Sequence, residues 1–263
     1  MGHTVVLCSI DGMRPDGLRL AKTPTIDSLR DKGAWTDKAR TVMPSVTLPC
    51  HTSMFRGVDV PRHGITTNIF IPLARPVPSL VDVAHGRGKR CGAFTNWGEL
   101  RDLCHPSSLA VHYCANVSHA PEDDERVARA AVEHLREEPF DFLFIYFGRT
   151  DSMGHAHGWM TEPYIDAISH ADFCLGLVLD ALKESGRDVT VLVQSDHGGH
   201  ERTHGTEMDE DMLIPWILSG KGVKPGQLTE EVRIYDTCPT LAHLLGLQPA
   251  KEWDGRVIQA ALL

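Results

Sequence analysis

"DVTVLVQSDHGGHERTHG", residues 188–205, joins an apolar run to a loop that is rich in histidine. The first seven residues are mostly apolar or β-branched, which predicts a buried strand over 188–194. The loop that follows carries one acid and three histidines, namely Asp196, His197, His200 and His204. Histidine-rich loops also occur as plain surface, but imidazoles beside a carboxylate are typical of half a metal site. The loop forms part of a metal site only if the rest of the chain supplies the remaining ligands.

Apolar runs of strand length alternate with helical patterns along the rest of the chain. Strands are predicted at 4–10, 90–95, 141–147, 188–194 and 213–219. Helices are predicted between the cap Thr23 and the stop Gly33, and at 47–56, 79–86, 121–138, 162–184 and 236–246. Such alternation indicates a three-layer α/β fold with a mostly parallel central sheet flanked by helices. With no repeat or linker in view, 1–263 is predicted to be a single catalytic domain, with a small cap excursion around 96–120.

Potential metal ligands follow three of the predicted strands. In an open α/β sheet, ligands bind beyond the carboxyl ends of the strands, so these side chains are expected to converge. These potential ligands are three carboxylates and three imidazoles: Asp11, Asp151, Asp196, His155, His197 and His204. Six ligands are too many for one tetrahedral zinc but suit two metals with open positions for substrate. Two cations about 4 Å apart can bridge a phosphoryl group and stabilise both its entering and its leaving oxygen.

A candidate nucleophile lies in "MPSVTLPCHTSMFRG", residues 43–57, where a helix is expected to begin near Thr47. A threonine at a helix N-terminus is ordinarily only an N-cap. Beside two metals the interpretation changes, because a bound metal lowers the pKa of a hydroxyl enough to generate an attacking oxyanion. A helix N-terminus also favours a phosphoryl anion.

Composition narrows the class of protein. The chain has 263 residues, is 42% hydrophobic and carries a formal net charge of −9. This size and apolar content predict a sizeable core. The negative charge argues against binding a nucleic-acid polymer, which requires clustered Lys and Arg. It leaves an anionic small-molecule substrate open, because bound divalent cations reverse the local field.

Cysteine usage and terminal sequence bear on the compartment. The seven cysteines are scattered, and no CxxC pair occurs. Reduced thiols in a cytoplasm are therefore expected rather than a disulfide framework. The segment "TVVLCSI" at 4–10 is too short for a signal-peptide core. No apolar run approaches the ~20 residues of a membrane span, so no membrane association is expected. The sequence specifies no oligomeric state.

At these residues the chain resembles the alkaline phosphatase superfamily, and within it the type I phosphodiesterase/nucleotide pyrophosphatase branch. The matching segments, in chain order, are "SIDGMRPD", "MPSVTLPCHTSMFRGVDVPRHGITTN", "TDSMGHAHG", "YIDAISHADFCLGLVLDAL", "SDHGGHERTHG" and "YDTCPTLAHLLGL". The resemblance therefore runs nearly end to end and implies an alkaline-phosphatase-like fold. The chain departs from secreted members of the branch in one respect, because only six residues separate His197 from His204.

The resemblance also implies roles for individual residues. One metal would be held by Asp151, His155 and His204, and the other by Asp11, Asp196 and His197. Thr47 would contact the second metal as the nucleophile. Asn68 would donate a hydrogen bond to a non-bridging phosphoryl oxygen. The mixed ligands favour zinc, with manganese or iron as other occupants. From the residues alone, His200 remains an alternative to His204, and Asn68 an alternative loop cap.

These observations predict a two-metal hydrolase of small-molecule phosphodiester or pyrophosphate bonds that works through a phosphothreonine intermediate. A phosphomonoesterase or phosphonate hydrolase on the same scaffold is the alternative, and a catalytically inactive metal-binding protein is a remote one. A diester is favoured because neutral Asn68, rather than a cation, accompanies Thr47. That preference depends on whether an arginine reaches the site; the candidates are Arg14, Arg56, Arg101 and Arg149.

Overall fold

A single mixed sheet forms the centre of the computed structural model, which describes residues 2–73, 76–115, 120 and 122–263. Its eight strands in the described chain run in the order β4-β3-β5-β1-β6-β7-β2-β8. Their bounds are β1 His3–Ile10, β2 Ala34–Arg40, β3 Cys91–Thr95, β4 Val111–Cys114, β5 Phe142–Phe147, β6 Asp188–Gln194, β7 Leu213–Gly220 and β8 Gly226–Gln227. Strands that are distant in sequence are thus neighbours in space.

The central strands are parallel. β1 pairs in parallel with β5 on one side and β6 on the other, and β5, β3 and β4 continue the parallel arrangement. β7 is antiparallel to both β6 and β2. The mostly parallel sheet that the sequence predicted is therefore confirmed. Its most important consequence is that β5, β1 and β6 end side by side at the same edge.

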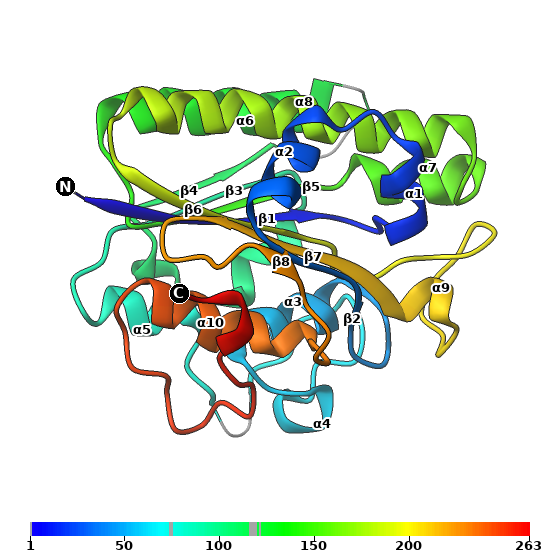
Figure 1. Cartoon of the computed structure of the whole chain (residues 1–263). Helices are drawn as coiled ribbons and strands as arrows, with labels where there is room; N and C mark the ends of the chain where they lie inside the picture. Colours follow the sequence, from blue (N-terminus) through cyan, green and yellow to red (C-terminus); the bar gives the residue numbers. More distant parts are fainter. Residues whose placement is uncertain (1, 74–75, 116–119, 121) are drawn as a thin grey trace.

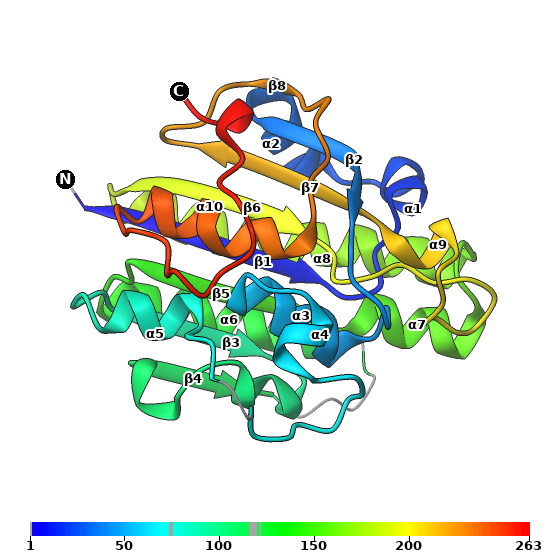
Figure 2. The ribbon, with the colours of Figure 1, turned by 90° about the horizontal axis from the view of Figure 1, so that it is seen from below.

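Helices cover both faces of the sheet (Figures 1 and 2). One layer contains α1 Pro15–Leu20, α2 Pro24–Lys32, α6 Glu122–Glu137, α7 Arg149–His157 and α8 Glu162–Glu184. The other contains α3 Thr47–Arg56, α4 Val60–His63, α5 Leu80–His85 and α10 Thr237–Leu244. The short α9, Asp209–Met212, precedes β7. The three-layer arrangement matches the predicted fold class.

Alternation along β1 explains how one strand serves two cores. Val5 and Leu7 belong to the buried cluster that includes α3, α5 and α10. Val6 and Cys8 belong to the cluster that includes α6 and α8. Because successive side chains of a strand point to opposite faces, a strand buried on both faces has to be apolar throughout. This requirement is why "TVVLCSI" was recognisable as a central strand.

Three strands escaped the sequence-based prediction. β4 has only four residues, and β8 has two, so neither has a measurable period. β2, "AWTDKAR", contains polar and charged residues at its partly exposed positions. The segment 96–120 was expected to be an excursion. It contains two 3₁₀ turns, Gly98–Leu103 and Pro106–Ser108, and then edge strand β4, while 116–119 lie outside the described residues, as does residue 121 at the expected start of α6.

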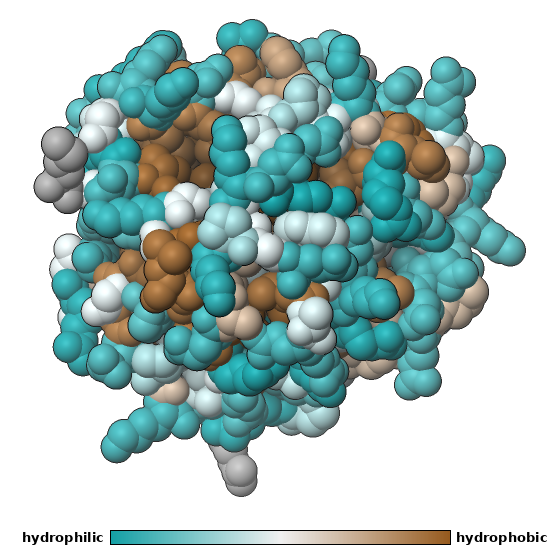
Figure 3. All heavy atoms as spheres, in the orientation of Figure 1, coloured by the Kyte–Doolittle hydropathy of each residue, from teal (hydrophilic) through white to brown (hydrophobic). Residues whose placement is uncertain are grey.

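The surface and the cysteines complete the description. On the face seen in Figure 3, hydrophilic residues separate several distinct hydrophobic patches. None of the described helices is both long and apolar enough to cross a bilayer. All seven cysteines fall within the described chain and are free thiols, and all except Cys114 are buried.

Candidate metal centre

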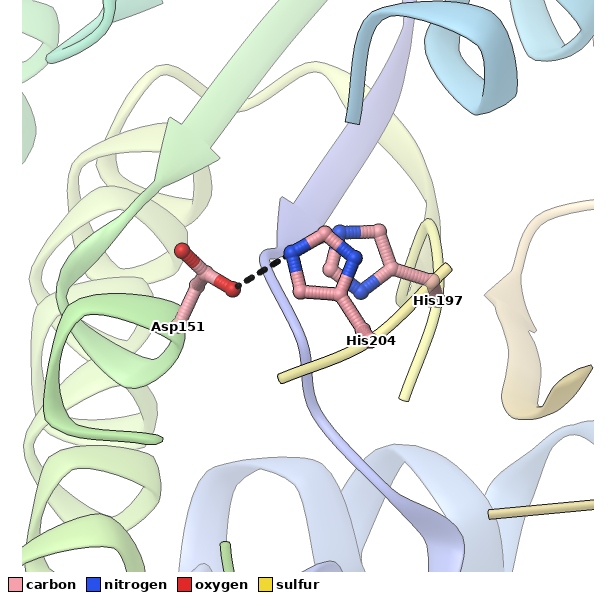
Figure 4. Close-up of side chains that lie close together, drawn as sticks. All are labelled: Asp151, His197 and His204. Atoms are coloured by element: carbon pink, nitrogen blue, oxygen red, sulfur yellow. Dashed lines mark ion pairs between the residues drawn. The ribbon is translucent and has the colours of Figure 1, made fainter. Parts of the chain in front are cut away.

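The carboxyl ends of the three central strands deliver the predicted ligands. Asp11 follows β1 directly, and Asp151 lies in the first turn of α7 just after β5. Asp196 and His197 follow β6, and the same connection returns with His204. Figure 4 shows the carboxylate of Asp151 facing the ring of His204, with the ring of His197 behind it. The parallel sheet order therefore brings together side chains from opposite halves of the chain.

Two groups of potential ligand atoms form around His197. The ligand atoms of Asp11, Asp196 and His197 lie within 4.8 Å of one another, as do those of Asp151, His197 and His204. Nε2 of His197 is 3.3 Å from both Asp11 Oδ1 and Asp196 Oδ2. Nε2 of His204 is 3.6 Å from Asp151 Oδ1. His197 thus lies between the two groups.

His155 lies at the rim of this centre. Its Nε2 is 3.4 Å from Asp151 Oδ1, and its ring centroid is 5.0 Å from that of His204. The side chain is 45% exposed, whereas that of His204 is 10% exposed. The helical spacing of Asp151 and His155 therefore puts both on one face of α7, as the sequence predicts.

The histidines share one hydrogen-bonding pattern. Nδ1 of His197 donates to the carbonyl of Gly198 at 2.8 Å, and Nδ1 of His204 donates to that of Ser45 at 2.8 Å. Nδ1 of His155 donates to the carbonyl of Arg202 at 2.9 Å. A carbonyl can only accept, so these contacts require a proton on Nδ1, and in the neutral ring the lone pair is then on Nε2. All three rings therefore present Nε2 for metal coordination.

The carboxylates at the centre are only partly satisfied by hydrogen bonds. One oxygen of each is buried without a hydrogen-bond donor among the described residues: Asp11 Oδ1, Asp151 Oδ1 and Asp196 Oδ2. Burial, together with repulsion between neighbouring carboxylates, raises the pKa of Asp11 well above its usual range and those of Asp151 and Asp196 to about 7. Burial lowers the pKa of His204 to about 3. Uncompensated carboxylates beside neutral imidazoles fit divalent metal ions, which supply the missing positive charge.

Thr47 is the first residue of α3, and its side chain does not cap the helix. The N-cap position is held by Val46. Thr47 is buried, and its Oγ1 lies 3.2 Å from Nε2 of His197. The hydroxyl therefore faces the group formed by Asp11, Asp196 and His197. The helix N-terminus behind it favours an anion at the same place.

Asn68 is held beside Thr47 by a backbone contact. Its Oδ1 accepts the N–H of Leu48, the second residue of α3, at 3.0 Å. This contact fixes the orientation of the amide and leaves both Nδ2 protons as donors. Asn68 thus satisfies a helix-terminal N–H and still offers a donor beside Thr47.

A cavity of about 160 Å³ joins these groups. It is lined by Asp11, Thr47, Asn68, Trp97, Tyr146, Gly148, Asp151, Ser152, His155 and His204. Among the described residues, no Lys or Arg lines it, including the four arginines that the sequence left open. Arg14 is instead paired with Asp16 at 2.6 Å, and Arg56 donates to the carbonyl of Val77. Among the described residues, no Lys or Arg therefore supplies positive charge to this cavity.

Two side chains outside the predicted ligand set support the centre. The hydroxyl of Tyr146 donates to Asp11 Oδ2 and so orients that carboxylate. His51, one turn after Thr47, donates from Nδ1 to the carbonyl of Thr47 at 2.9 Å and lies 3.4 Å from Asp196 Oδ2. A tyrosine near the end of a buried strand is the only sequence signal for the first contact. His200, in contrast, is paired with Asp211 at 2.8 Å and takes no part in either ligand group.

Known structures resemble this chain in fold. The murine ectonucleotide pyrophosphatase/phosphodiesterase 5, in an inactive form in complex with AMP, superimposes with a TM-score of 0.80 at 18% identity, covering 99% of this chain and 100% of that chain. A 2-O glycosaminoglycan sulfatase superimposes with a TM-score of 0.76 at 17% identity, covering 98% and 73%. These likenesses confirm the alkaline-phosphatase-like fold.

Curated relatives come from two groups of enzymes. Ectonucleotide pyrophosphatase/phosphodiesterase family member 7 of Rattus norvegicus is 24% identical over 226 residues, which are 74% of this chain and 50% of that protein. The 2,3-bisphosphoglycerate-independent phosphoglycerate mutase of Listeria welshimeri is 33% identical over 134 residues, 49% of this chain and 25% of that enzyme. The chain therefore spans about half the length of the rat protein and a quarter of the length of the Listeria enzyme.

The family model matches most of the chain. The Metalloenzyme superfamily model covers residues 13–249, which include every predicted ligand except Asp11. The predicted resemblance is therefore confirmed at this level, and the ectonucleotide pyrophosphatase/phosphodiesterase relatives support the predicted branch. This chain belongs to the metalloenzyme, or alkaline-phosphatase-like, superfamily.

Proposed function

We propose that this protein is a two-metal hydrolase that cleaves phosphodiester or pyrophosphate bonds of small molecules through a phosphothreonine at Thr47. One observation carries the proposal: the buried hydroxyl of Thr47 and the neutral amide of Asn68 line the same cavity, and no Lys or Arg among the described residues lines it. A diester monoanion has less charge on its non-bridging oxygens than a monoester dianion, so it depends less on an Arg or Lys. The cavity therefore suits a diester better than a monoester.

The metals are proposed to occupy the two sides of His197. Asp11, Asp196 and His197 would hold one ion, and Asp151, His155 and His204 the other. Zinc is the favoured occupant for this mixture of imidazole and carboxylate ligands. Bound metal would lower the pKa of the Thr47 hydroxyl and stabilise charge on the leaving oxygen.

The chain's own groups account for the remaining steps. Oγ1 of Thr47 forms a bond to phosphorus while the bond from phosphorus to the leaving oxygen breaks, which leaves a phosphothreonine and releases an alcohol or phosphate. Water then cleaves the bond between Oγ1 and phosphorus, which releases the second product and restores the hydroxyl. In both steps Nδ2 of Asn68 donates to a non-bridging oxygen, in the manner of an oxyanion hole. The α3 N-terminus adds a favourable dipole.

Relatives indicate which substrate class to test first. The murine neighbour is an inactive threonine-to-alanine variant in complex with AMP. A nucleotide with an esterified phosphate is accordingly the first substrate class to test for this chain. The sulfatase neighbours share the fold at 17% identity or less, whereas the phosphodiesterase family is also found among the relatives by sequence, at 24% identity over 74% of this chain.

The proposal is tested with three substrates that share one leaving group, p-nitrophenolate. Zinc-loaded protein is assayed at one pH with bis(p-nitrophenyl) phosphate, thymidine p-nitrophenyl phosphate and p-nitrophenyl phosphate. The expected result is a higher kcat/KM for the diesters, with all activity lost in Thr47→Ala. A preference for the monoester that disappears in Arg149→Ala would instead identify a phosphomonoesterase. Absence of turnover with every ester, despite bound metal, would favour a catalytically inactive metal-binding protein.

A further inference from the structure

We propose that Asp211 is a positioning residue that sets the place of His204 in the metal centre by holding both sides of its loop. This inference rests on the proposed metal-binding role of His204. It concerns a carboxylate outside both ligand groups. Asp211 lies in the short α9, immediately before β7, and is fully buried.

The side chain of Asp211 accepts three hydrogen bonds from one loop. Its Oδ1 accepts from Nδ1 of His200 at 2.8 Å. Its Oδ2 accepts from both the backbone N–H and the hydroxyl of Thr206, each at 2.8 Å. His200 precedes His204 by four residues, and Thr206 follows it by two. One buried carboxylate therefore holds the loop on both sides of the ligand.

Backbone contacts extend the same attachment toward β6. The N–H of Gly198 donates to the carbonyl of Asp211, and the N–H of Gly199 donates to that of Glu210, each at 2.8 Å. The end of the loop is attached to the segment before α3, because Oγ of Ser45 donates to the carbonyl of Thr206 at 2.9 Å. The loop is thus attached at its start, at its end and through the side chain of Asp211.

The placement of His204 depends on this attachment. Its Nε2 has to lie beside Asp151, which belongs to α7 and not to the loop, so contacts within the loop alone cannot fix the distance. Its other nitrogen is held by the carbonyl of Ser45. Gly205 then turns the chain with φ of +108°, a conformation open mainly to glycine, toward Thr206 and the carboxylate. Loss of the Asp211 contacts would release His200 and Thr206, which lie on either side of His204, from this shared attachment.

The electrostatics favour an ionised Asp211. Burial alone would disfavour its charge, but the hydrogen bonds from His200 and Thr206 outweigh that effect and lower the pKa of this carboxyl. Charge-assisted hydrogen bonds are stronger than neutral ones, so an ionised acceptor holds the loop more firmly. An amide at this position would keep the size and lose the charge. Asp211→Asn is therefore the substitution that isolates the contact.

The test measures zinc binding, not turnover, by competition with a chelator of known affinity. Wild-type protein is expected to bind two zinc ions. Asp211→Asn is expected to weaken one of them about tenfold to a hundredfold, the usual effect of removing a group that orients a ligand, and to leave the other unchanged. Thr206→Val, which removes only the hydroxyl donor, is expected to give a smaller loss at the same site.

A matched control separates positioning from general stability. Asp172 is also a buried carboxylate and accepts the backbone N–H groups of Thr25 and Ile26 at 3.2 and 2.7 Å, in neither ligand group. Asp172→Asn should lower the melting temperature and leave both zinc affinities unchanged. His200→Gln keeps a donor for Asp211 and should retain zinc binding, whereas His200→Leu should weaken the same single ion.

Three results would overturn the inference. The first is an Asp211→Asn protein with both zinc affinities intact, and the second is equal weakening of both ions. The third is equal loss of zinc in His200→Gln and His200→Leu, because His200 would then be a ligand and not a partner of Asp211. A wild-type protein that binds two zinc ions but hydrolyses no ester would contradict the proposed function alone, and the zinc measurements would still decide the role of Asp211.

Discussion

The imidazole rings of His197 and His204 are stacked, with centroids 3.8 Å apart and an interplanar angle of 17°. The two rings belong to different predicted metal sites, although only six residues separate them in sequence. The chain can fold back so tightly because Gly198 and Gly199 follow His197. A Cβ at Gly199 would lie 2.2 Å from Cε2 of Trp159, and one at Gly198 would lie 2.0 Å from the carbonyl oxygen of Glu210.

Substitution of Gly199 should therefore destabilise the folded protein. The added methyl of Gly199→Ala meets the rigid ring of Trp159, and overpacking of this kind costs about 1–3 kcal/mol. Urea unfolding of the metal-free proteins measures the difference. Gly98→Ala is the control, because the nearest atom to its Cβ among the described residues, apart from its chain neighbours, would be an Arg101 nitrogen at 4.0 Å. A Gly199→Ala protein as stable as the control would mean that Trp159 moves aside freely.

The role of Thr47 is tested by two substitutions that differ in one hydroxyl. Thr47→Ala should abolish nearly all turnover and leave zinc stoichiometry and melting temperature close to those of wild type. Thr47→Ser should retain part of the activity, because its Oγ can still attack phosphorus. Rapid-quench experiments with a ³²P-labelled diester should trap labelled protein in wild type and in Thr47→Ser only. Near-normal rates in Thr47→Ala would show that water attacks phosphorus directly.

Metal-free protein should lose stability as the pH rises. The folded-state pKa values of Asp151 and Asp196 are raised to about 7, above those of an unfolded chain, so the folded state binds more protons between about pH 4 and 7. Their contribution to stability is therefore present at low pH and disappears as the pH rises through 7. Melting temperatures in EDTA should fall across this range. With saturating zinc the fall should vanish, and a chelated protein whose stability stays flat would contradict the expected burial of these carboxyls.

Asn68 should contribute to the transition state through its N–H group. Asn68→Ala is expected to lower kcat/KM for a diester by about 2–4 kcal/mol of transition-state stabilisation, the cost of one oxyanion-hole donor. Asn68→Asp separates the two roles of the side chain, because it keeps an acceptor for the N–H of Leu48 and loses the donor. It should be at least as impaired as Asn68→Ala. Wild-type rates in Asn68→Asp would show that the residue only anchors α3.

Much of the centre was predictable because its parts follow simple rules. Asp11, Asp151 and Asp196 come directly after apolar strands, and parallel strands bring such positions to one edge. The choice between His200 and His204 could not be made from spacing, because both lie in the same glycine-containing loop. In the structure His200 pairs with Asp211, a residue outside the loop, while His204 lies beside Asp151, and both contacts are set by tertiary structure. The contact of Tyr146 with Asp11 was hidden for the same reason.

The fold was predictable where burial imposed a pattern. β1 and β6 are buried on both faces, which makes them almost continuously apolar, and α8 is long enough to show its period. β2 was missed because polar residues occupy its partly exposed positions. β4 and β8 were missed because strands of four and two residues are too short to have a pattern.

The position of β1 between β5 and β6 has a consequence for how the protein opens. Proteins unfold locally from their least stable segments, and short edge strands with few buried side chains open first. β4 and β8 are such strands, and they are the outermost members of the sheet. The ligands, in contrast, follow the three strands at its centre. Backbone amides at the edges should therefore exchange with deuterium early, through openings that leave the candidate ligands in place, whereas those of β1 should exchange only when the whole sheet comes apart and any bound metal is released.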